Sequence, residues 1–127
     1  MIYFLVMLGG ALGTLGRFLL SAYAASHWGE TFPWGTLIIN VTGSFVIGFF
    51  GTLTDPDGAL LVRPAARTFF MIGICGGYTT FSSFSLQTLR LAQNGQWFNA
   101  GANIVASNVG CLFAVWLGHI CAAAFRR

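Results

Sequence analysis

Hydrophobic residues form four long runs along the chain, and short polar or turn-rich segments separate them. A helix needs about 20 apolar residues to cross the hydrocarbon core of a bilayer, and each run is long enough to do so. The segment 55–58, Asp-Pro-Asp-Gly, has strong turn-forming chemistry between two of the runs. The pattern therefore predicts an all-α membrane protein with four transmembrane helices in a single domain over residues 1–127. Its approximate spans are 2–25, 35–54, 66–92 and 97–125.

The composition strengthens this prediction. Of the 127 residues, 56% are hydrophobic and only 7% are charged, whereas about a quarter of the residues in a soluble domain carry charge. Mean hydropathy is +0.75. The net charge of +3 comes from scattered arginines rather than from a basic stripe, so we expect a lipid bilayer and no nucleic acid as the environment of this surface. The small arginine bias between the two sides is compatible with both insertion orientations.

Polar residues recur at helical spacing inside three of the runs. Polar side chains within a span are costly unless they face protein or a water-filled path. These residues are uncharged and carry hydrogen-bond donors, which suits a small anion or water. The alternative is hydrogen bonding between neighbouring helices, without a path. The stripes are Thr36, Asn40 and Ser44; Thr79, Ser83 and Gln87; and Asn99, Asn103, Ser107 and Cys111.

The middle of the third run has poor helix chemistry. Its segment 73–85 contains adjacent glycines followed by Thr79 and Thr80, a sequence that favours a helix break with one threonine capping a second half-helix. A break at membrane depth frees backbone groups that protein, ion or water must satisfy. Unwound carbonyls are a recurrent sodium site. Close packing through Gly73 and Gly77 is the alternative explanation of the glycines.

Two phenylalanines and one arginine lie close to this segment in the sequence pattern. Phe81 and Phe84 are three residues apart, on roughly one face of a helix. The edge of an aromatic ring is positive and can solvate an anion, although paired phenylalanines are more often core or lipid contacts. Arg17 is the basic residue within the first run. It either extends to the membrane surface or attracts anions in a vestibule.

The sequence gives less support to three other functions: an enzyme, a proton-coupled exporter and a non-conducting accessory subunit. We expect no enzyme, because His27 and His119 lie near span ends without a suitably placed nucleophile or acid. A proton-coupled exporter of hydrophobic cations needs a carboxylate within the membrane. A non-conducting accessory subunit would use its polar stripes only for packing. The three acidic residues all lie in predicted loops and are Glu30, Asp55 and Asp57.

Three motifs resemble those of the Fluc (CrcB-type) family of fluoride channels. The motifs are Gly-Gly-Ala-Leu-Gly at 9–13 followed by Arg17, the segment 35–45, and Cys-Gly-Gly-Tyr-Thr-Thr-Phe-Ser-Ser-Phe-Ser at 75–85. The resemblance spans nearly the whole chain. It implies a fluoride-selective channel that exports fluoride passively and gives fluoride resistance. It also implies an antiparallel, dual-topology homodimer with two pores, and a location in the bacterial inner membrane.

The same resemblance implies roles for individual residues. Backbone carbonyls of Gly76 and Thr79 from both subunits are expected to hold a central structural sodium ion, and Arg17 is expected in the vestibule. No organic cofactor is implied. The chain departs from the common family pattern at Gln87, where Glu is frequent, at Cys111, where Gly-Ser is frequent, and at Asn103, where some members have Tyr. The expected fluoride-pore residues are Asn40, Thr80, Phe81, Ser83, Phe84 and Ser107.

Overall fold

The computed structural model describes residues 1–126, and this part of the chain consists only of helices and the loops between them. Four segments are long and apolar enough to cross a membrane: Ile2–Trp28, Trp34–Leu53, Pro64–Gln93 and Trp97–Ala123. The predicted all-helical class and the four spanning helices are confirmed, and the protein is an integral membrane protein. The helices are α1 (Ile2–Trp28), α2 (Trp34–Leu53), α3 (Pro64–Thr68), the π-helix η1 (Phe69–Cys75), α4 (Gly76–Tyr78), α5 (Phe81–Gln93) and α6 (Trp97–Ala123).

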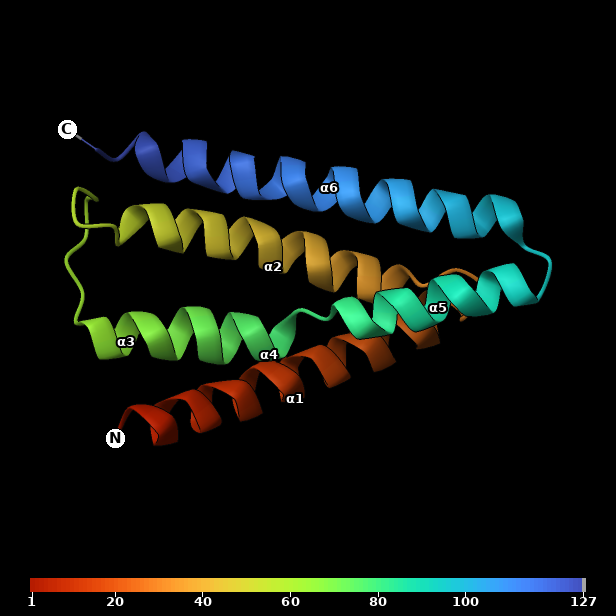
Figure 1. Cartoon of the computed structure of the whole chain (residues 1–127), viewed down its shortest axis with the longest axis horizontal. Coiled ribbons are helices and arrows are strands. Elements are labelled where there is room, and N and C mark those ends of the chain that lie inside the picture. Colours follow the sequence, from red (N-terminus) through yellow and green to blue (C-terminus); the bar gives the residue numbers. More distant parts are fainter. Residues whose placement is uncertain (127) are drawn as a thin grey trace.

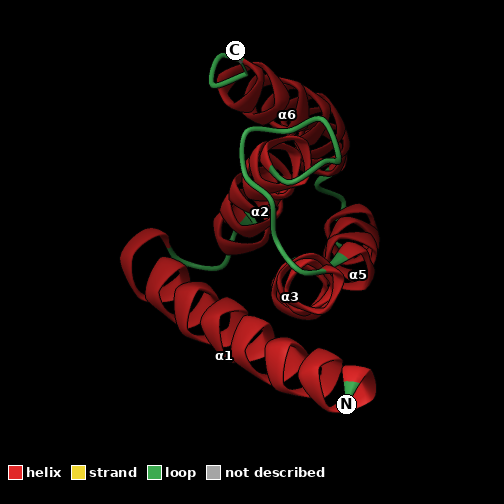
Figure 2. Cartoon of the chain, turned by 90° about the vertical axis from the view of Figure 1, so that its left-hand side faces the viewer, coloured by secondary structure: helices red, strands yellow, loops and turns green. Residues whose placement is uncertain are grey.

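The helices pair unequally. Figure 1 shows both chain ends at the same end of the bundle, as an even number of crossings requires. Helices α2 and α6 pack along one another, whereas α1 packs mainly against η1 and α4 on the other side of the molecule (Figure 2). The backbone of α5 lies close to α6 and, at few positions, to α2, but not to α1. The second half of the third span is therefore held from one side.

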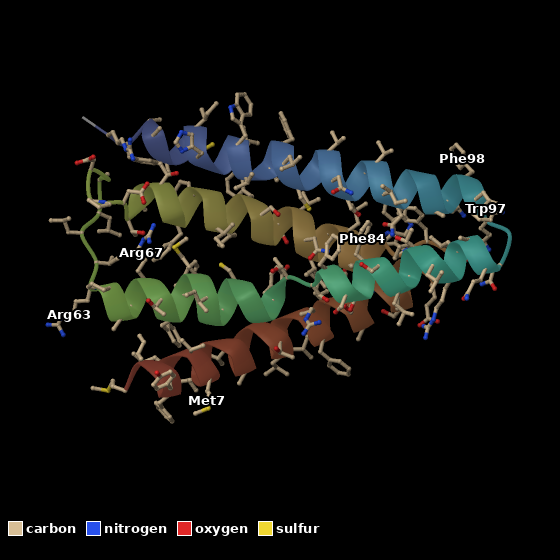
Figure 3. All side chains as sticks on the ribbon, viewed as in Figure 1. Met7, Arg63, Arg67, Phe84, Trp97 and Phe98 are labelled. Atoms are coloured by element: carbon tan, nitrogen blue, oxygen red, sulfur yellow. The ribbon has the colours of Figure 1, made fainter. Side chains whose placement is uncertain are left out.

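Large apolar side chains cover the outside of the bundle. Phe98 is 86% exposed, and Figure 3 shows Met7 pointing away from the neighbouring helices. Many of the buried apolar residues are small, such as Ala24 and Ala122. This distribution is the one expected in lipid, where burial of apolar surface does not drive helix association and small residues allow close packing.

Glycines bring α1 into backbone contact with the third span. A methyl group added at Gly9 would lie 2.6 Å from the carbonyl oxygen of Phe69 and 2.9 Å from the Cα of Gly73. Gly77 packs in the same way against the backbone of Gly10. Gly73 and Gly77 therefore have the close-packing role that was one of their two explanations, and Gly9 and Gly10 provide the opposite surface.

A polar cluster lies at the end of the bundle that contains the α2–α3 loop. Arg67 donates from Nε to Thr54 Oγ1 at 3.1 Å and from Nη2 to Asp55 Oδ1 at 2.9 Å. Thr54 is the residue that ends α2, so the arginine joins α3 to the C-terminal end of α2. Figure 3 shows Arg67 reaching toward α2, whereas Arg63 points away from the bundle.

Candidate functional site

The third span loses its helical backbone at two consecutive threonines. Thr79 has φ −79° and ψ 155°, and Thr80 has φ −153° and ψ 114°, so both are extended. The Thr80 side chain accepts a hydrogen bond from the backbone amide of Ser83 at 3.2 Å and so caps α5. The wider π-helical turns of η1 precede the break, and such turns are frequent at functional sites. The predicted break is confirmed, with Thr80 as the cap.

Asn40 of α2 satisfies the backbone at the break. Its Nδ2 donates to the carbonyl oxygen of Thr80 at 3.0 Å, and its Oδ1 accepts from the amide of Thr80 at 2.8 Å. These two bonds fix the orientation of the amide group. Because an Nδ2 group has two N–H donors, one donor remains beyond the bond to Thr80.

Arg17 satisfies the break from the opposite side. Its Nε donates to the carbonyl oxygen of Gly77 at 3.1 Å, and Thr14 Oγ1 lies 3.5 Å from the same oxygen. Gly77 belongs to α4, the short helix that ends at the break. A cation at a helix C-terminus is favourable, because the terminal carbonyls carry partial negative charge. Arg17 is half-buried in this position.

Three carbonyl oxygens at the break remain without such partners. Within residues 1–126, the backbone oxygens of Gly76, Tyr78 and Thr79 accept no hydrogen bond. Of these three residues, Gly76 and Thr79 line the same groove, and Gly76 is exposed. Buried or lipid-facing carbonyls need a partner. Carbonyl oxygen is a ligand type suited to hard cations, so these two residues fit the expected sodium site in chemistry.

A groove of about 370 Å³ runs between α2, the break and α6. It contains no charged side chain among its lining residues. Ser44 and Cys111 of the predicted polar stripes line it. So do seven of the nine residues expected in the pore, the vestibule and the sodium site: Asn40, Gly76, Thr79, Thr80, Phe81, Phe84 and Ser107.

The two phenylalanines lie side by side in different environments. Their ring centroids are 5.3 Å apart and their planes are inclined by 48°. Phe84 is 7% exposed, whereas Phe81 is 74% exposed. Figure 3 shows Phe84 on the side of α5 that faces α2. The pair therefore extends from the interior of the groove to the molecular surface.

Hydrogen bonds connect the groove to the contact between α5 and α6. Ser107 Oγ donates to Asn103 Oδ1 at 3.3 Å, Asn103 Nδ2 donates to Thr88 Oγ1 at 2.9 Å, and Thr88 Oγ1 donates to the carbonyl oxygen of Phe84 at 2.8 Å. Asn103 is 1% exposed. This chain of bonds holds the Phe84 turn of α5 against α6.

A second cavity of about 500 Å³ lies at the end of the bundle that contains the α1–α2 and α5–α6 loops. Thr36, Gln87 and Arg90 are among its lining residues. Gln87 Oε1 is buried and has no hydrogen-bond partner in the described part of the chain. Gln87 therefore lies beside this cavity and not in the groove.

The structure separates some residues that the sequence pattern had grouped. Ser83 does not line the groove, although Thr80 Oγ1 donates to Ser83 Oγ at 3.1 Å. Arg17 also lies outside it, behind the break. The stripe Thr79, Ser83 and Gln87 is wrong as one helical face, because a period of four residues cannot continue through extended backbone.

Sequence reasoning missed two polar residues. Thr88 lies four residues after Phe84, so counting from the start of α5 rather than across the break would have found it. Asn108 lines the groove, and its Nδ2 donates to the carbonyl oxygen of Ile104 at 2.8 Å. Its neighbour Ser107 belongs to the predicted stripe, and Asn108 lies about 100° away from it around the helix.

Comparison with known proteins shows to which family the chain belongs. Residues 4–119 match the family described as CrcB-like protein, Camphor Resistance (CrcB). The chain belongs to the CrcB family. Three similar relatives are each named fluoride-specific ion channel FluC. The protein from Opitutus terrae is 62% identical over 121 residues, which cover 95% of this chain and 92% of the relative. The protein from Rhodospirillum rubrum is 59% identical over 120 residues, covering 94% and 93%. The protein from Paramagnetospirillum magneticum is 58% identical over 125 residues, covering 98% of both.

Membership of the CrcB family confirms the family resemblance that the three sequence motifs indicated. It also decides whether the protein is an enzyme. The family is one of ion channels, so this protein is not an enzyme. The two histidines have structural partners: His27 Nδ1 lies 2.9 Å from the carbonyl oxygen of Tyr23, and His119 Nδ1 lies 2.8 Å from Thr52 Oγ1.

Proposed function

We propose that this CrcB protein is a fluoride-selective channel that lets fluoride leave the cell passively. The observation that carries the proposal is the uncharged groove, which combines hydrogen-bond donors with the two phenylalanines beside a broken helix. The names of its relatives support the choice of fluoride. We also propose the bacterial inner membrane as its location, where export protects against fluoride that enters as HF.

The proposed pathway replaces the water lost by the ion with several weak donors. The remaining N–H of Asn40 and the hydroxyl of Ser107 donate hydrogen bonds in the groove, and the hydroxyl pair of Thr80 and Ser83 at its edge supplies a further proton. The ring edges of Phe81 and Phe84 contribute positive potential. Fluoride is the smallest halide and binds such donors most strongly. Because no site carries a full charge, the ion can leave again, as conduction requires.

Arg17 is the proposed vestibule residue. Its bond to Gly77 uses Nε, and the guanidinium keeps its positive charge close to the break. A fixed positive charge raises the local anion concentration.

The proposed assembly is an antiparallel homodimer with two pores. The groove opens on the surface of one chain, and polar residues beside it are exposed at the depth of the spanning helices, including Ser82, Ser85 and Asn108. Such groups are costly in lipid unless protein covers them. A second copy in the opposite orientation would cover these groups, and the weak charge bias between loops permits that orientation.

We further propose a structural sodium ion at the dimer centre, held by Gly76 and Thr79 of both copies. The unpaired carbonyls of these two residues support this site. When bound, the cation supplies a partner for carbonyls that a broken helix leaves unsatisfied.

Fluoride efflux from proteoliposomes, recorded with a fluoride electrode, tests the proposed function. We expect efflux from the unmodified protein and at least a tenfold loss in Phe84→Leu, with the dimer still assembling. Phe98→Leu is the matched control, because Phe98 is exposed at the start of α6 and lies outside the groove. Efflux equal to that of empty vesicles would refute the proposal. Normal efflux in Phe84→Leu would remove Phe84 from the pathway.

The same experiment distinguishes the other candidate functions. An accessory subunit should conduct nothing, and Phe84→Leu should change either its assembly or nothing. A proton-coupled cation exporter needs an acid within the spans, whereas Glu30, Asp55 and Asp57 all lie outside the helices. No observation of this structure favours either candidate over the channel.

A further inference from the structure

The chain of hydrogen bonds that links Ser107, Asn103, Thr88 and Phe84 across α6 and α5 runs in one donor-to-acceptor direction. The carbonyl oxygen of Phe84 can only accept, so Thr88 uses its single proton there. The lone pairs of Thr88 then accept from Asn103 Nδ2, which turns Oδ1 of the same amide toward Ser107. Ser107 also has a single proton, and it donates that proton to Asn103 Oδ1. In this arrangement Ser107 offers lone pairs, and no donor, to any other ligand.

This direction conflicts with the role of a fluoride ligand. Fluoride only accepts hydrogen bonds, so Ser107 must turn its O–H away from Asn103 before it can bind the ion. Ser107 is the sole partner of Asn103 Oδ1 among the described residues, and Asn103 is 1% exposed, so no solvent can replace it. The Ser107–Asn103 bond is also the longest of the three, at 3.3 Å. It is therefore the weakest of the three hydrogen bonds and the one that breaks most readily.

We propose that Asn103 sets the fluoride affinity of the pathway by competing with the ion for the hydroxyl proton of Ser107. Asn103 is a positioning residue and does not touch the ion. This inference rests on the proposed fluoride channel. A net hydrogen bond to a buried oxygen is worth a factor of about two to ten in an equilibrium constant. Binding at Ser107 is weakened by that factor, which favours release and rapid conduction.

The test measures fluoride efflux from proteoliposomes over a range of fluoride concentrations. Asn103→Leu removes the competing oxygen and retains a side chain of similar size. We expect the half-saturating fluoride concentration to fall by about two- to tenfold, with a lower maximal rate because release slows. Asn99→Leu is the matched control, since it makes the same substitution one turn earlier in α6, where the amide donates to Gln96 Oε1 and lies outside the groove. Its half-saturating concentration should stay within about twofold of the unmodified protein.

A second background separates competition from packing. In Ser107→Ala there is no proton to compete for, so adding Asn103→Leu should leave the half-saturating concentration unchanged. An equal shift in both backgrounds, or no shift in the single variant, overturns the inference. If Asn103→Leu does not assemble, Asn103→Ala removes the same amide and is measured in the same two backgrounds. An absence of fluoride efflux from the unmodified protein would instead overturn the proposed function, and this inference with it.

Discussion

The side-chain amide of Asn40 and the backbone of Thr80 form a closed pair of hydrogen bonds, with Nδ2 donating at 3.0 Å and Oδ1 accepting at 2.8 Å. A backbone amide and carbonyl released by the helix break are thus paired by one residue of another helix. The same two bonds hold the remaining N–H of Asn40 in a fixed direction. The break and the proposed ion ligand therefore form one structural unit.

Asn40→Asp should abolish this arrangement with little change in side-chain size. The carboxylate keeps an acceptor for the Thr80 amide, but it cannot donate to the Thr80 carbonyl, and it brings negative charge into an anion pathway. The half-buried Thr80 carbonyl loses its partner, and the negative charge repels fluoride from the groove, so we expect fluoride efflux to fall by about tenfold or more. Asn94→Asp makes the same change in the exposed loop after α5 and should conduct normally. Normal efflux in Asn40→Asp would exclude Asn40 from the pathway.

Arg17 should contribute to stability through its bond to Gly77. Arg17→Gln removes the guanidinium from the α4 terminus, and hydrogen bonds to charged groups are worth about 1.5–3 kcal/mol. We expect a lower midpoint of thermal unfolding in detergent, with only partial recovery in Arg17→Lys, because an ammonium group does not reproduce the geometry of Nε. Arg63→Gln is the matched control, since Arg63 is exposed and points away from the bundle (Figure 3). Equal midpoints for Arg17→Gln and Arg63→Gln would show that the Gly77 bond contributes nothing.

Two adjacent glycines of α1 should respond in opposite ways to alanine. A methyl group at Gly9 would meet the Phe69 carbonyl at 2.6 Å, whereas one at Gly10 has nothing within 4 Å. Gly9→Ala should destabilise the protein by about 1–3 kcal/mol. Gly10→Ala should be neutral, or stabilising by up to about 1 kcal/mol, because alanine is the better helix former. Thermal unfolding of both variants in detergent measures the difference, and similar losses in the two would contradict the α1 packing described above.

Most of the fold could be predicted because it depends on local chemistry. Hydrocarbon thickness sets the length of an apolar run, so four runs predict four spans. The helices themselves extend past the apolar residues, as α1 does to Trp28, because backbone hydrogen bonding continues until a turn-forming residue such as Gly29 ends it. The break at Thr79 and Thr80 was predictable for the same local reason, from adjacent glycines and a capping threonine.

The detailed site could not be predicted, because it depends on which helices become neighbours. No sequence spacing relates Arg17 to the carbonyl of Gly77, or Asn103 to Thr88, since each contact joins two separate spans. The extended residues at the break also change the rotation of α5 relative to α4. The faces of α5 can therefore be assigned only by counting from its own first turn.

The sodium site gives the last prediction, and it concerns the dimer. If Gly76 and Thr79 carbonyls of two copies bind one cation, replacing sodium by N-methyl-D-glucamine should lower the unfolding midpoint and the fraction of dimer in detergent. At a concentration 100 times its dissociation constant, a ligand of the folded state stabilises by about 2.7 kcal/mol. Thr79→Val is the informative variant, because it removes the hydroxyl that donates to Cys75 and keeps the backbone carbonyl. We expect Thr79→Val to retain the full response to sodium. An unfolding midpoint and dimer fraction that do not depend on sodium would remove the cation from the proposed assembly.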